Sequence, residues 1–385
     1  MKVGILTFHF SENYGALFQS YALKQWFEDN GCEVLFIDYK PSYIEDGGRF
    51  SLQKPIVRSN GKVVYLYLSK VFNWITVPAQ FRYNKKTFQR EMLPVSETSY
   101  SKSQEMRESE REECFDLIVC GSDQVWNPPE HHGVDPVYFL DSSVVGKAFG
   151  NPKRISYAPS FGSDILDAKY SEQVATLISN LDAVSVREKS GAEIIHHLCN
   201  LDVPVVPDPT LLHTDFRHLH EEYPGIDDDY VFCYCLRSGE VIRDVSEKLS
   251  KKLGLKIYSP HNPHRRWKEI GTSIFPSPGQ WLKIQYDAKF VVTNSFHGVA
   301  LSVVQKKDFL YVPLAGARGK MNARAFNLLK TLNLEDRIVD NLDSIADMVD
   351  TPVDWDAVET YLVPLRAAGV DYLSEQISAL KYAEV

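Results

Sequence analysis

The chain has 385 residues, 44% hydrophobic and 24% charged, a composition typical of a globular protein with room for two α/β domains. Its net charge of −9 disfavours nucleic-acid binding but permits a local cationic cluster around a small anion. No apolar run reaches the roughly eighteen residues of a membrane span. The six cysteines form no CxxC pair, and we interpret the start as a buried strand rather than a signal peptide, so we expect a cytoplasmic protein.

Short β-branched and aromatic runs alternate with helix-like stretches along most of the chain. Strands are expected at residues 2–8, 33–38, 115–120, 154–158, 182–187, 203–206, 230–236, 255–258, 289–293 and 308–312. Helices are expected at residues 15–30, 170–180, 188–198, 240–253, 299–306 and 321–332. This alternation predicts an α/β fold with two parallel sheets in tandem, joined by crossover helices.

A pause around Asp208 and Pro209, followed by the acidic stretch 221–229, separates the two groups of strands. Residues 41–112 show no clear strand alternation, and we interpret them as a partly helical excursion from the first domain. The tail looks like an amphipathic helix that packs back on the first domain. The predicted N-terminal domain, C-terminal domain and tail are residues 1–207, 208–353 and 354–385.

Ligands of open α/β sheets bind where strands end and helices begin. The first such turn contains His9, Asn13, Tyr14 and Gly15. Gly15 lets the backbone approach a ligand closely, and the free N–H groups at a helix start suit an anion. The turn lacks the GxGxxG fingerprint of dinucleotide sites. A ligand-binding loop and an ordinary tight turn around a buried aromatic ring both remain open.

Two later turns combine polar and aromatic residues. After residues 115–120, Asp123 and Gln124 can accept hydroxyl hydrogen bonds, and Trp126 offers a flat face to a sugar ring. The alternative is an Asx turn in which Trp126 plugs the base of the domain. After residues 154–158, Ser160 stands close to a glycine and suits phosphate or carboxylate contact, which is a weak signal alone.

Four cationic residues are candidates for an anion site. Arg187 stands where an apolar strand stops, and arginine holds a carboxylate or phosphate through two parallel hydrogen bonds. An ion pair with Glu188 is the alternative. Arg318, Lys320 and Arg324 lie in and after a Gly-containing loop, where a solvated basic loop is equally open.

The most informative segment is residues 290–298, FVVTNSFHG. A buried strand delivers His297 to a turn that Gly298 permits, directly before a helical run. A histidine at such a switch, after Asn294 and Ser295, is a candidate for acid–base chemistry or phosphate binding. The sequence holds no HExxH, Walker A or GxSxG motif, which disfavours a zinc hydrolase, a P-loop ATPase and an α/β-hydrolase.

Taken in order, these turns resemble the polysaccharide pyruvyl transferase family. The resembling segments are TFHFSENYGALFQSYAL at 7–23, GSDQVWNP at 121–128, SYAPSFG at 156–162, SVRE at 185–188, PDPTLL at 207–212, TNSFHG at 293–298 and NARAFNLLKTLNL at 322–334. The resemblance implies two Rossmann-like domains facing each other across a cleft, as in GT-B glycosyltransferases. It also implies a donor, phosphoenolpyruvate, and a sugar diol acceptor that receives a pyruvate ketal during surface-polysaccharide biosynthesis.

The resemblance places the family histidine at His297 and the family arginine at Arg187. His297 would act as acid or base or stabilise the leaving phosphate, Arg187 would hold the donor, and Asp123 is our candidate base for the sugar hydroxyl. Some members carry an arginine where this chain has Ser295, and Pro159 stands where a small residue is common. The expected donor-binding residues are Asn13, Gly15, Ser160, Ser295, Gly298, Arg318, Lys320 and Arg324. The expected acceptor-binding residues are His9, Tyr14, Gln124 and Trp126.

The expected partners are phosphoenolpyruvate and a sugar or lipid-linked oligosaccharide, with no metal and no cofactor besides the donor. A lipid-linked acceptor would bring the protein to the inner face of the membrane, and the oligomeric state stays open. Two alternatives compete: a nucleotide-sugar glycosyltransferase of the same fold class, and a family member that only binds glycans. Intact His297 and Arg187 disfavour the second, whereas Ser295 leaves it open. The absence of an iron–sulfur cysteine cluster disfavours a redox role.

Overall fold

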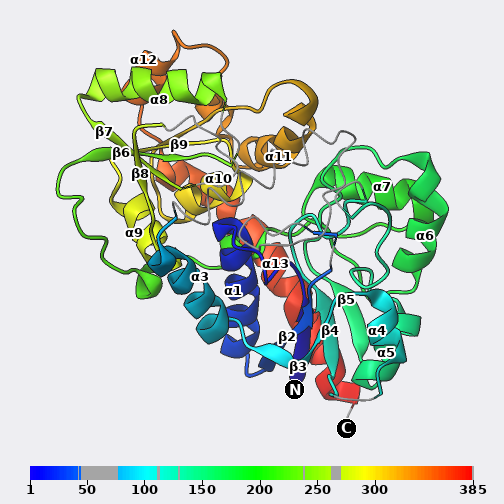
Figure 1. The fold of residues 1–385 in the computed structure, drawn as a ribbon. Helices are drawn as coiled ribbons and strands as arrows, with labels where there is room; N and C mark the ends of the chain where they lie inside the picture. Colours follow the sequence, from blue (N-terminus) through cyan, green and yellow to red (C-terminus); the bar gives the residue numbers. More distant parts are fainter. Residues whose placement is uncertain are drawn as a thin grey trace, which may run out of the picture.

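The computed structural model describes residues 1–41, 43–44, 77–110, 113–128, 131–236, 239–261 and 270–383. Two lobes are visible, each built on a five-stranded parallel sheet (Figure 1). The first sheet contains, in spatial order, β3 (Val95–Tyr100), β2 (Glu33–Tyr39), β1 (Lys2–Leu6), β4 (Leu117–Cys120) and β5 (Lys153–Ser156). The second contains β10 (Phe309–Tyr311), β9 (Phe290–Thr293), β6 (Tyr230–Tyr234), β7 (Lys256–Pro260) and β8 (Thr272–Ile274).

Both sheets have the same winding. In each, the first strand in sequence occupies the centre, the next two extend to one side, and the last two extend to the other. The strand order therefore reverses between β1 and β4 in the first sheet and between β6 and β9 in the second. Such switch points open a crevice at the carboxyl ends of the strands, where ligands of doubly wound sheets bind.

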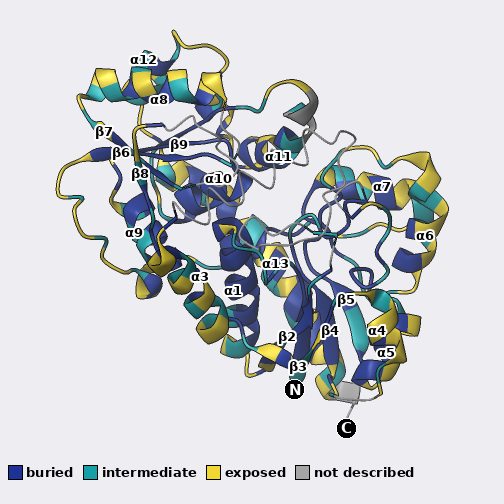
Figure 2. Cartoon of the chain, viewed as in Figure 1, coloured by how far each residue is buried: buried dark blue, intermediate teal, exposed yellow. Residues whose placement is uncertain are grey.

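Helices cover the sheets with their apolar sides inward, so exposed surface gathers on the outer faces of the lobes (Figure 2). No helix in the described ranges is long and apolar enough to cross a membrane. The helices of the first lobe are α1 (Tyr14–Asp29), α3 (Ala79–Met92), α4 (Ser103–Glu108), α5 (Ser142–Phe149), α6 (Ser171–Ser179) and α7 (Lys189–Cys199). The later ones are α8 (Glu240–Leu253), α9 (Pro278–Asp287), α10 (Phe296–Val304), α11 (Ala323–Thr331), α12 (Ile345–Asp350) and α13 (Trp355–Ala383).

The central strands form where the sequence is continuously apolar. Every residue of β4, β6 and β9 is buried, as parallel strands covered on both faces require. Helix α8 ends at Gly254, whose φ of 69° gives the left-handed C-cap that glycine adopts without strain. These elements follow directly from apolar runs and a helix stop signal.

Two strands escape the sequence prediction, and two predicted strands do not form regular ladders. The prediction of no strand alternation across 41–112 is wrong for β3, whose polar residues alternate between exposed and buried at the sheet edge. Strand β8, at an edge of the second sheet, is also missing from the prediction and has only three residues. Residues 182–187 and 203–206 meet through a single isolated bridge, Val186 to Val205, because Pro204 interrupts the second segment.

The long terminal helix α13 lies against the first lobe (Figure 1). The Tyr372 hydroxyl donates to the carbonyl of Ser156 at the end of β5, at 2.9 Å. Arg366 donates to the carbonyl of Leu211 at 2.9 Å. A Cβ on Gly369 would lie 2.5 Å from the Tyr157 hydroxyl, so glycine permits this close packing.

Helices α1 and α3 join the two lobes. The ring of Tyr14 stacks on Trp281 of α9 with centroids 5.3 Å apart, and its hydroxyl donates to the carbonyl of Pro276 at 2.8 Å. Phe81 of α3 contacts Phe275 edge-on at 5.5 Å. The start of α1 therefore lies beside the second sheet, where the site described next is assembled.

Candidate active site

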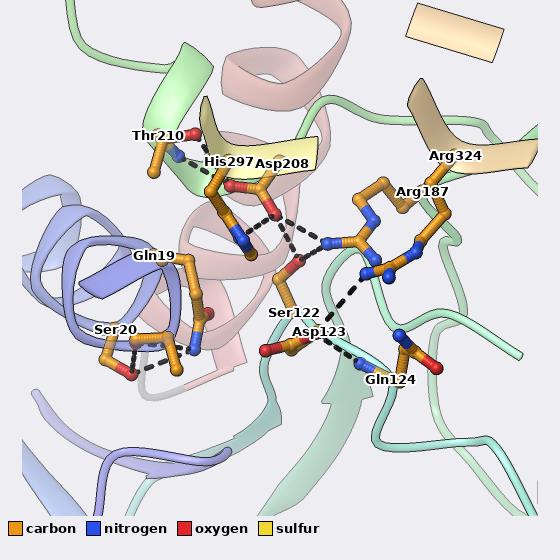
Figure 3. A network of polar contacts seen from close by, with 12 residues as sticks. Gln19, Ser20, Ser122, Asp123, Gln124, Arg187, Asp208, Thr210, His297 and Arg324 are labelled. Atoms are coloured by element: carbon orange, nitrogen blue, oxygen red, sulfur yellow. Dashed lines mark hydrogen bonds and ion pairs between the residues drawn. The ribbon is translucent and has the colours of Figure 1, made fainter. Parts of the chain in front are cut away.

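Side chains from both lobes meet at the switch points of the two sheets (Figure 3). Ser122 and Asp123 follow β4 of the first sheet, and His297 follows β9 of the second. Arg187 and Arg324 come from the loop before α7 and from α11. Four of the predicted positions are thereby brought to one region, with two residues that the prediction did not include: Asp208 and Ser122.

Asp208 is the centre of the polar network. Its Oδ1 accepts hydrogen bonds from the backbone N–H and the hydroxyl of Thr210, at 3.1 and 2.8 Å. Its Oδ2 accepts from Ser122 Oγ and Arg187 Nη1, both at 2.8 Å. Burial alone would raise the pKa of this carboxyl, but the nearby charges of His297 and Arg187 and the hydrogen bond from Arg187 hold it well below its usual range. Asp208 is therefore a buried carboxylate.

His297 lies in the first turn of α10. The helix begins at Phe296, whereas the sequence predicted a start after Gly298, because Ser295 caps the helix and its Oγ accepts from the Gly298 N–H at 3.3 Å. The His297 side chain is almost entirely buried. Its Nε2 lies 3.6 Å from Asp208 Oδ2, too far for a hydrogen bond, and has no other partner.

The capping geometry corrects one predicted donor contact. The N–H of Gly298 donates to Ser295 Oγ, so this N–H is not free for an incoming anion, whereas the hydroxyl hydrogen of Ser295 is not used by this contact. A Cβ on Gly298 would lie 2.2 Å from Thr293 Oγ1. Glycine is thus needed here for close packing of α10 on β9. The sequence pattern alone does not distinguish this structural requirement from a glycine that lets a ligand approach the backbone.

Gly15 contacts the catalytic candidate directly. A Cβ at this position would lie 2.2 Å from His297 Nδ1 and 2.4 Å from its Cγ. The preceding Asn13 caps α1, with its Oδ1 accepting from the Gly15 N–H at 3.0 Å and from the Tyr234 hydroxyl at 3.1 Å. The turn after β1 is therefore part of the site, and its glycine is required because the imidazole occupies the space of a side chain.

Arg187 is held on two sides by carboxylates. Its Nε donates to Glu188 Oε1 at 3.0 Å, and its Nη1 donates to Asp208 and, at 3.2 Å, to Ser122 Oγ. Burial would lower its pKa, but Glu188, Asp208 and Asp123 raise it, so the guanidinium stays charged. Its Nη2 is buried without a hydrogen-bond partner. The ion pair and the potential for ligand binding therefore coexist in one side chain.

Arg324 lies beside Arg187 (Figure 3). Both guanidinium groups approach the ring of Phe296, at 5.9 Å from its centroid for Arg324 and 4.6 Å for Arg187. Its Nη1 is 3.7 Å from Asp123 Oδ1, and with the Gln124 amide oxygen turned toward it, Nη2 donates to that oxygen at 2.6 Å. Burial and the neighbouring charge of Arg187 lower the pKa of Arg324. Its Nε is buried without a partner.

The predicted stacking of two aromatic rings on the acceptor is wrong. Trp126 has no exposed surface: it stacks on Phe139 at 5.0 Å and donates to the carbonyl of Tyr138 at 2.9 Å. Tyr14 is buried against Trp281. The apolar face of each ring is covered by the protein core, and both residues support the turns that carry their polar neighbours.

His9 does not join the cluster around Asp208. Its Nε2 lies 3.1 Å from Asp38 Oδ1, and its Nδ1 lies 3.1 Å from the carbonyl of Thr7. With 3% of its surface exposed, it offers no contact to an acceptor. A strand-end histidine was a reasonable candidate, but a carboxylate from the neighbouring strand β2 pairs with it.

A narrow pocket beside Arg324 opens between the lobes. It is lined by residues 160–164, by Glu188 and the start of α7, and by α11. Ser160 is buried, and its Oγ accepts from the Gly162 N–H at 3.0 Å, a contact that does not use its hydroxyl hydrogen. Gly162 has a φ of 68°, which glycine adopts without strain. The side chains of Arg318 and Lys320 lie outside what the structure describes.

Two backbone positions at the site are strained. Asp123 has a φ of 82°, and Ala158, directly before Pro159, has a φ of 55°. Left-handed conformations are uncommon for residues other than glycine and gather at functional sites. The turn after β4 and the turn after β5 are joined by an isolated β-bridge between Asp123 and Pro159. In the described ranges, no group of three or more His, Cys, Asp or Glu residues is arranged to hold a metal ion.

Sequence reasoning missed Asp208, Ser122 and Phe296 as site residues. Asp208 stands in the PDPTLL segment and Ser122 in GSDQVWNP, both within the stretches that carry the family resemblance. An aspartate before Pro209 was interpreted as a linker signal. The cap it forms at Thr210 also fits that interpretation, and only the fold shows that its second oxygen meets Arg187.

The architecture is that of GT-B-like proteins, as the resemblance implied. A UDP-GlcNAc 2-epimerase from Methanocaldococcus jannaschii superposes with a TM-score of 0.51 at 11% identity, covering 95% of this chain and 99% of that one. The UDP-N-acetylglucosamine 2-epimerase from Rickettsia bellii gives 0.49 at 11% identity over 99% and 97%. At such identities the likeness concerns the fold alone, and the prediction of two parallel-sheet α/β domains is confirmed.

The family follows from the sequence rather than from the fold. A sequence model described as polysaccharide pyruvyl transferase matches residues 13–314, and the chain belongs to this family. The family points to a transferase with a sugar-containing acceptor. No curated protein matches the chain significantly.

Proposed function

We propose that this protein transfers the pyruvyl group of phosphoenolpyruvate to two hydroxyls of a sugar, forming a pyruvate ketal. One observation carries the proposal. Arg187 Nη2 and Arg324 Nε are buried N–H donors without hydrogen-bond partners, and both belong to the cluster where the lobes meet. Buried donors are normally satisfied, so a cluster of unsatisfied ones is suited to an anionic ligand.

The two arginines fit a donor with two anionic groups. Phosphoenolpyruvate carries a carboxylate and a phosphate on three carbons, and each group accepts charge-assisted hydrogen bonds from a guanidinium. Arg187 is fixed by Glu188 and Asp208, whereas Arg324 has weaker partners. Burial, and after it the repulsion from Arg187, lowers the pKa of Arg324, and a bound anion would relieve that repulsion. Arg324 occupies the role for which Arg318 and Lys320 were also candidates.

The proposed reaction balances without an oxidant or a reductant. A proton adds to the methylene carbon of phosphoenolpyruvate, which becomes a methyl group and leaves cationic character on the adjacent carbon. One sugar hydroxyl bonds to that carbon and loses its proton. The second hydroxyl bonds there as the carbon–oxygen bond to phosphate breaks, and its proton leaves with the phosphate. The products are one ketal and one inorganic phosphate.

His297 and Asp123 are the residues we assign to proton transfer. A histidine contributes to such steps as acid or base, and the buried position of His297 limits access of water. Asp123 retains a partly exposed carboxylate on the first lobe, where a sugar hydroxyl can reach it. The sugar would then lie over Asp123 and Gln124 rather than on the buried rings of Trp126 and Tyr14.

A nucleotide-sugar glycosyltransferase is the second candidate. The epimerase that shares the fold was solved with UDP-GlcNAc and UDP. Fold likeness at 11% identity does not identify a donor, and the family match favours phosphoenolpyruvate. We further propose a lipid-linked or polymeric sugar acceptor of surface-polysaccharide assembly, used at the cytoplasmic face of the membrane, and no cofactor besides the donor.

The test is phosphate release from phosphoenolpyruvate with galactoside, mannoside and N-acetylhexosamine acceptors, comparing wild type with His297→Ala. The proposal expects acceptor-dependent release that the substitution abolishes. UDP- and GDP-sugars are offered to the same protein with the same acceptors. Hydrolysis or transfer of a nucleotide sugar, with no binding of phosphoenolpyruvate by calorimetry, would favour the second candidate and refute the first. Release that persists in His297→Ala would remove His297 from the chemistry.

A further inference from the structure

His297 is bounded by Asp208 at one ring nitrogen and by Gly15 at the other. Its Nε2 faces Asp208 Oδ2 across 3.6 Å, while a Cβ added to Gly15 would lie 2.2 Å from its Nδ1. The imidazole is therefore approached from two directions: by a carboxylate on one edge, and by the bare backbone at the start of α1 on the other. No side chain stands on the Gly15 residue to cover the second edge.

The carboxylate at the first edge is fixed. Oδ1 of Asp208 is occupied by Thr210, and Oδ2 is occupied by Ser122 and Arg187. The side chain is entirely buried, so neither oxygen can turn toward water. A carboxylate only accepts hydrogen bonds, so the ring nitrogen that faces it is favoured as a donor N–H.

We infer that Asp208 is a positioning residue that keeps a proton on Nε2 of His297 and leaves Nδ1 as the nitrogen that exchanges a proton with the substrate. The proton-exchange half of this inference rests on the proposed function. The same carboxylate oxygen orients Arg187, so one residue sets both the donor-binding group and the proton-transfer group. In this arrangement an aspartate fixes the tautomer of a histidine at one ring nitrogen, and the other ring nitrogen is the reactive one.

In the step proposed above, the imidazolium gives the Nδ1 proton to the methylene carbon of phosphoenolpyruvate. The ring is then neutral with its remaining proton on Nε2, against Asp208. The proton lost by the attacking sugar hydroxyl restores Nδ1, directly or through Asp123. Proton count and charge are unchanged over the cycle, and Nε2 keeps its hydrogen throughout.

The tautomer is measured by long-range ¹H–¹⁵N NMR on the full-length protein labelled with ¹⁵N-histidine, without any substrate. The signals of His297 are assigned from their loss in His297→Gln. At a pH where the ring is neutral, we expect the proton on Nε2, and we expect Asp208→Asn to change the pattern toward Nδ1–H or a mixture. The Asp38→Asn variant is the matched control, because Asp38 pairs with a different buried histidine, His9, at 3.1 Å. It should leave the His297 signals unchanged.

An Nδ1–H tautomer in the wild type, or an unchanged His297 pattern in a folded Asp208→Asn variant, would overturn the inference. If Asp208→Asn does not fold, the wild-type tautomer alone still decides it. Kinetics add a second measurement: Asp208→Asn should lower kcat by about 10²–10⁴-fold, the usual size of an acid–base contribution, and also raise KM for the donor through Arg187. A change in KM alone would contradict the proton-transfer half. Because the NMR measurement needs no donor, failure of the proposed function would not be mistaken for failure of the tautomer assignment.

Discussion

Replacing either buried arginine of the site by methionine should separate ligand binding from folding. Arg187→Met removes hydrogen bonds to Glu188, Asp208 and Ser122 and leaves Asp208 without its main cation. Arg324→Met removes a longer contact, 3.7 Å, to the partly exposed Asp123, together with the bond to Gln124. We therefore predict unequal effects of the two substitutions on stability and similar effects on donor binding.

The magnitudes follow from the environment of each side chain. Removing one partner of a buried ion pair lowers the free energy of unfolding by about 3–5 kcal/mol, and we expect a decrease of this size for Arg187→Met. Arg324→Met should stay within about 1 kcal/mol of wild type, because the burial cost and repulsion that lower the pKa of Arg324 disappear with the charge. A hydrogen bond to a charged group contributes about 1.5–3 kcal/mol, so donor affinity should fall roughly 10- to 150-fold.

Urea unfolding gives the stabilities, and calorimetry with phosphoenolpyruvate gives the affinities. Arg337→Met is the matched control: Arg337 is equally buried, but it donates to the carbonyls of Met348 and Thr351 and lies outside the site. This control should lose stability and keep its donor affinity. An Arg324→Met variant that is as unstable as Arg187→Met, or that binds the donor like wild type, would refute the reasoning.

Three further predictions address packing and pH. Gly15→Ala places a Cβ within 2.2 Å of the His297 ring, so we expect about 1–3 kcal/mol of destabilisation and a loss of activity of order 10²-fold in steady-state assays. Burial would raise the pKa of Asp38, but hydrogen bonds from His9 and Lys40 lower it. The ionised carboxylate therefore stabilises the fold above about pH 4, and this contribution is lost as the pH falls further. Asp38→Asn should flatten the acid side of the stability profile measured by urea unfolding. Tyr372→Phe removes one buried hydrogen bond and should cost about 1 kcal/mol in the same assay without changing kcat.

Controls make these outcomes interpretable. Gly239→Ala introduces a Cβ with no atom within 4 Å and should leave activity unchanged, in contrast to Gly15→Ala. Full activity of Gly15→Ala would show that the imidazole does not need its observed position. An Asp38→Asn variant that retains the wild-type acid slope would assign that slope to other carboxyls. A loss of kcat in Tyr372→Phe would tie the terminal helix to catalysis rather than to folding.

The two sheets were predictable from sequence because their central strands are buried on both faces. Apolar runs such as residues 117–120 and 290–293 leave no other interpretation, and helix stops such as Gly254 mark the boundaries. Strand β3 was not predictable in this way, because an edge strand needs few apolar residues. Residues 182–187 show the opposite error: an apolar run predicted a strand, but its neighbour, residues 203–206, contains a proline and pairs only at one bridge.

The site was predictable where chemistry and chain position coincide. His297, Arg187, Asp123 and Arg324 all stand at strand ends or helix starts, and the fold brings them together. Burial decides the rest, and sequence does not reveal it. Trp126 stands in the same turn as Asp123, yet its ring points into the core.

Asp208 was missed because its role depends on distant residues. Its partners Ser122 and Arg187 precede it by 86 and 21 positions, and His297 follows much later in the second lobe. Locally, an aspartate before Pro209 is explained by the cap on Thr210. Only the tertiary structure assigns its second oxygen to the site.

The most direct test of the central claim is the fate of the three carbons of phosphoenolpyruvate. The protein is incubated with ¹³C-labelled phosphoenolpyruvate and an acceptor that supports phosphate release, and the glycan is analysed by mass spectrometry and NMR. The account predicts that the label enters the glycan as a ketal with a methyl group, in equal amounts with inorganic phosphate. Phosphate release with the label recovered as free pyruvate, or an unlabelled glycan, would contradict it.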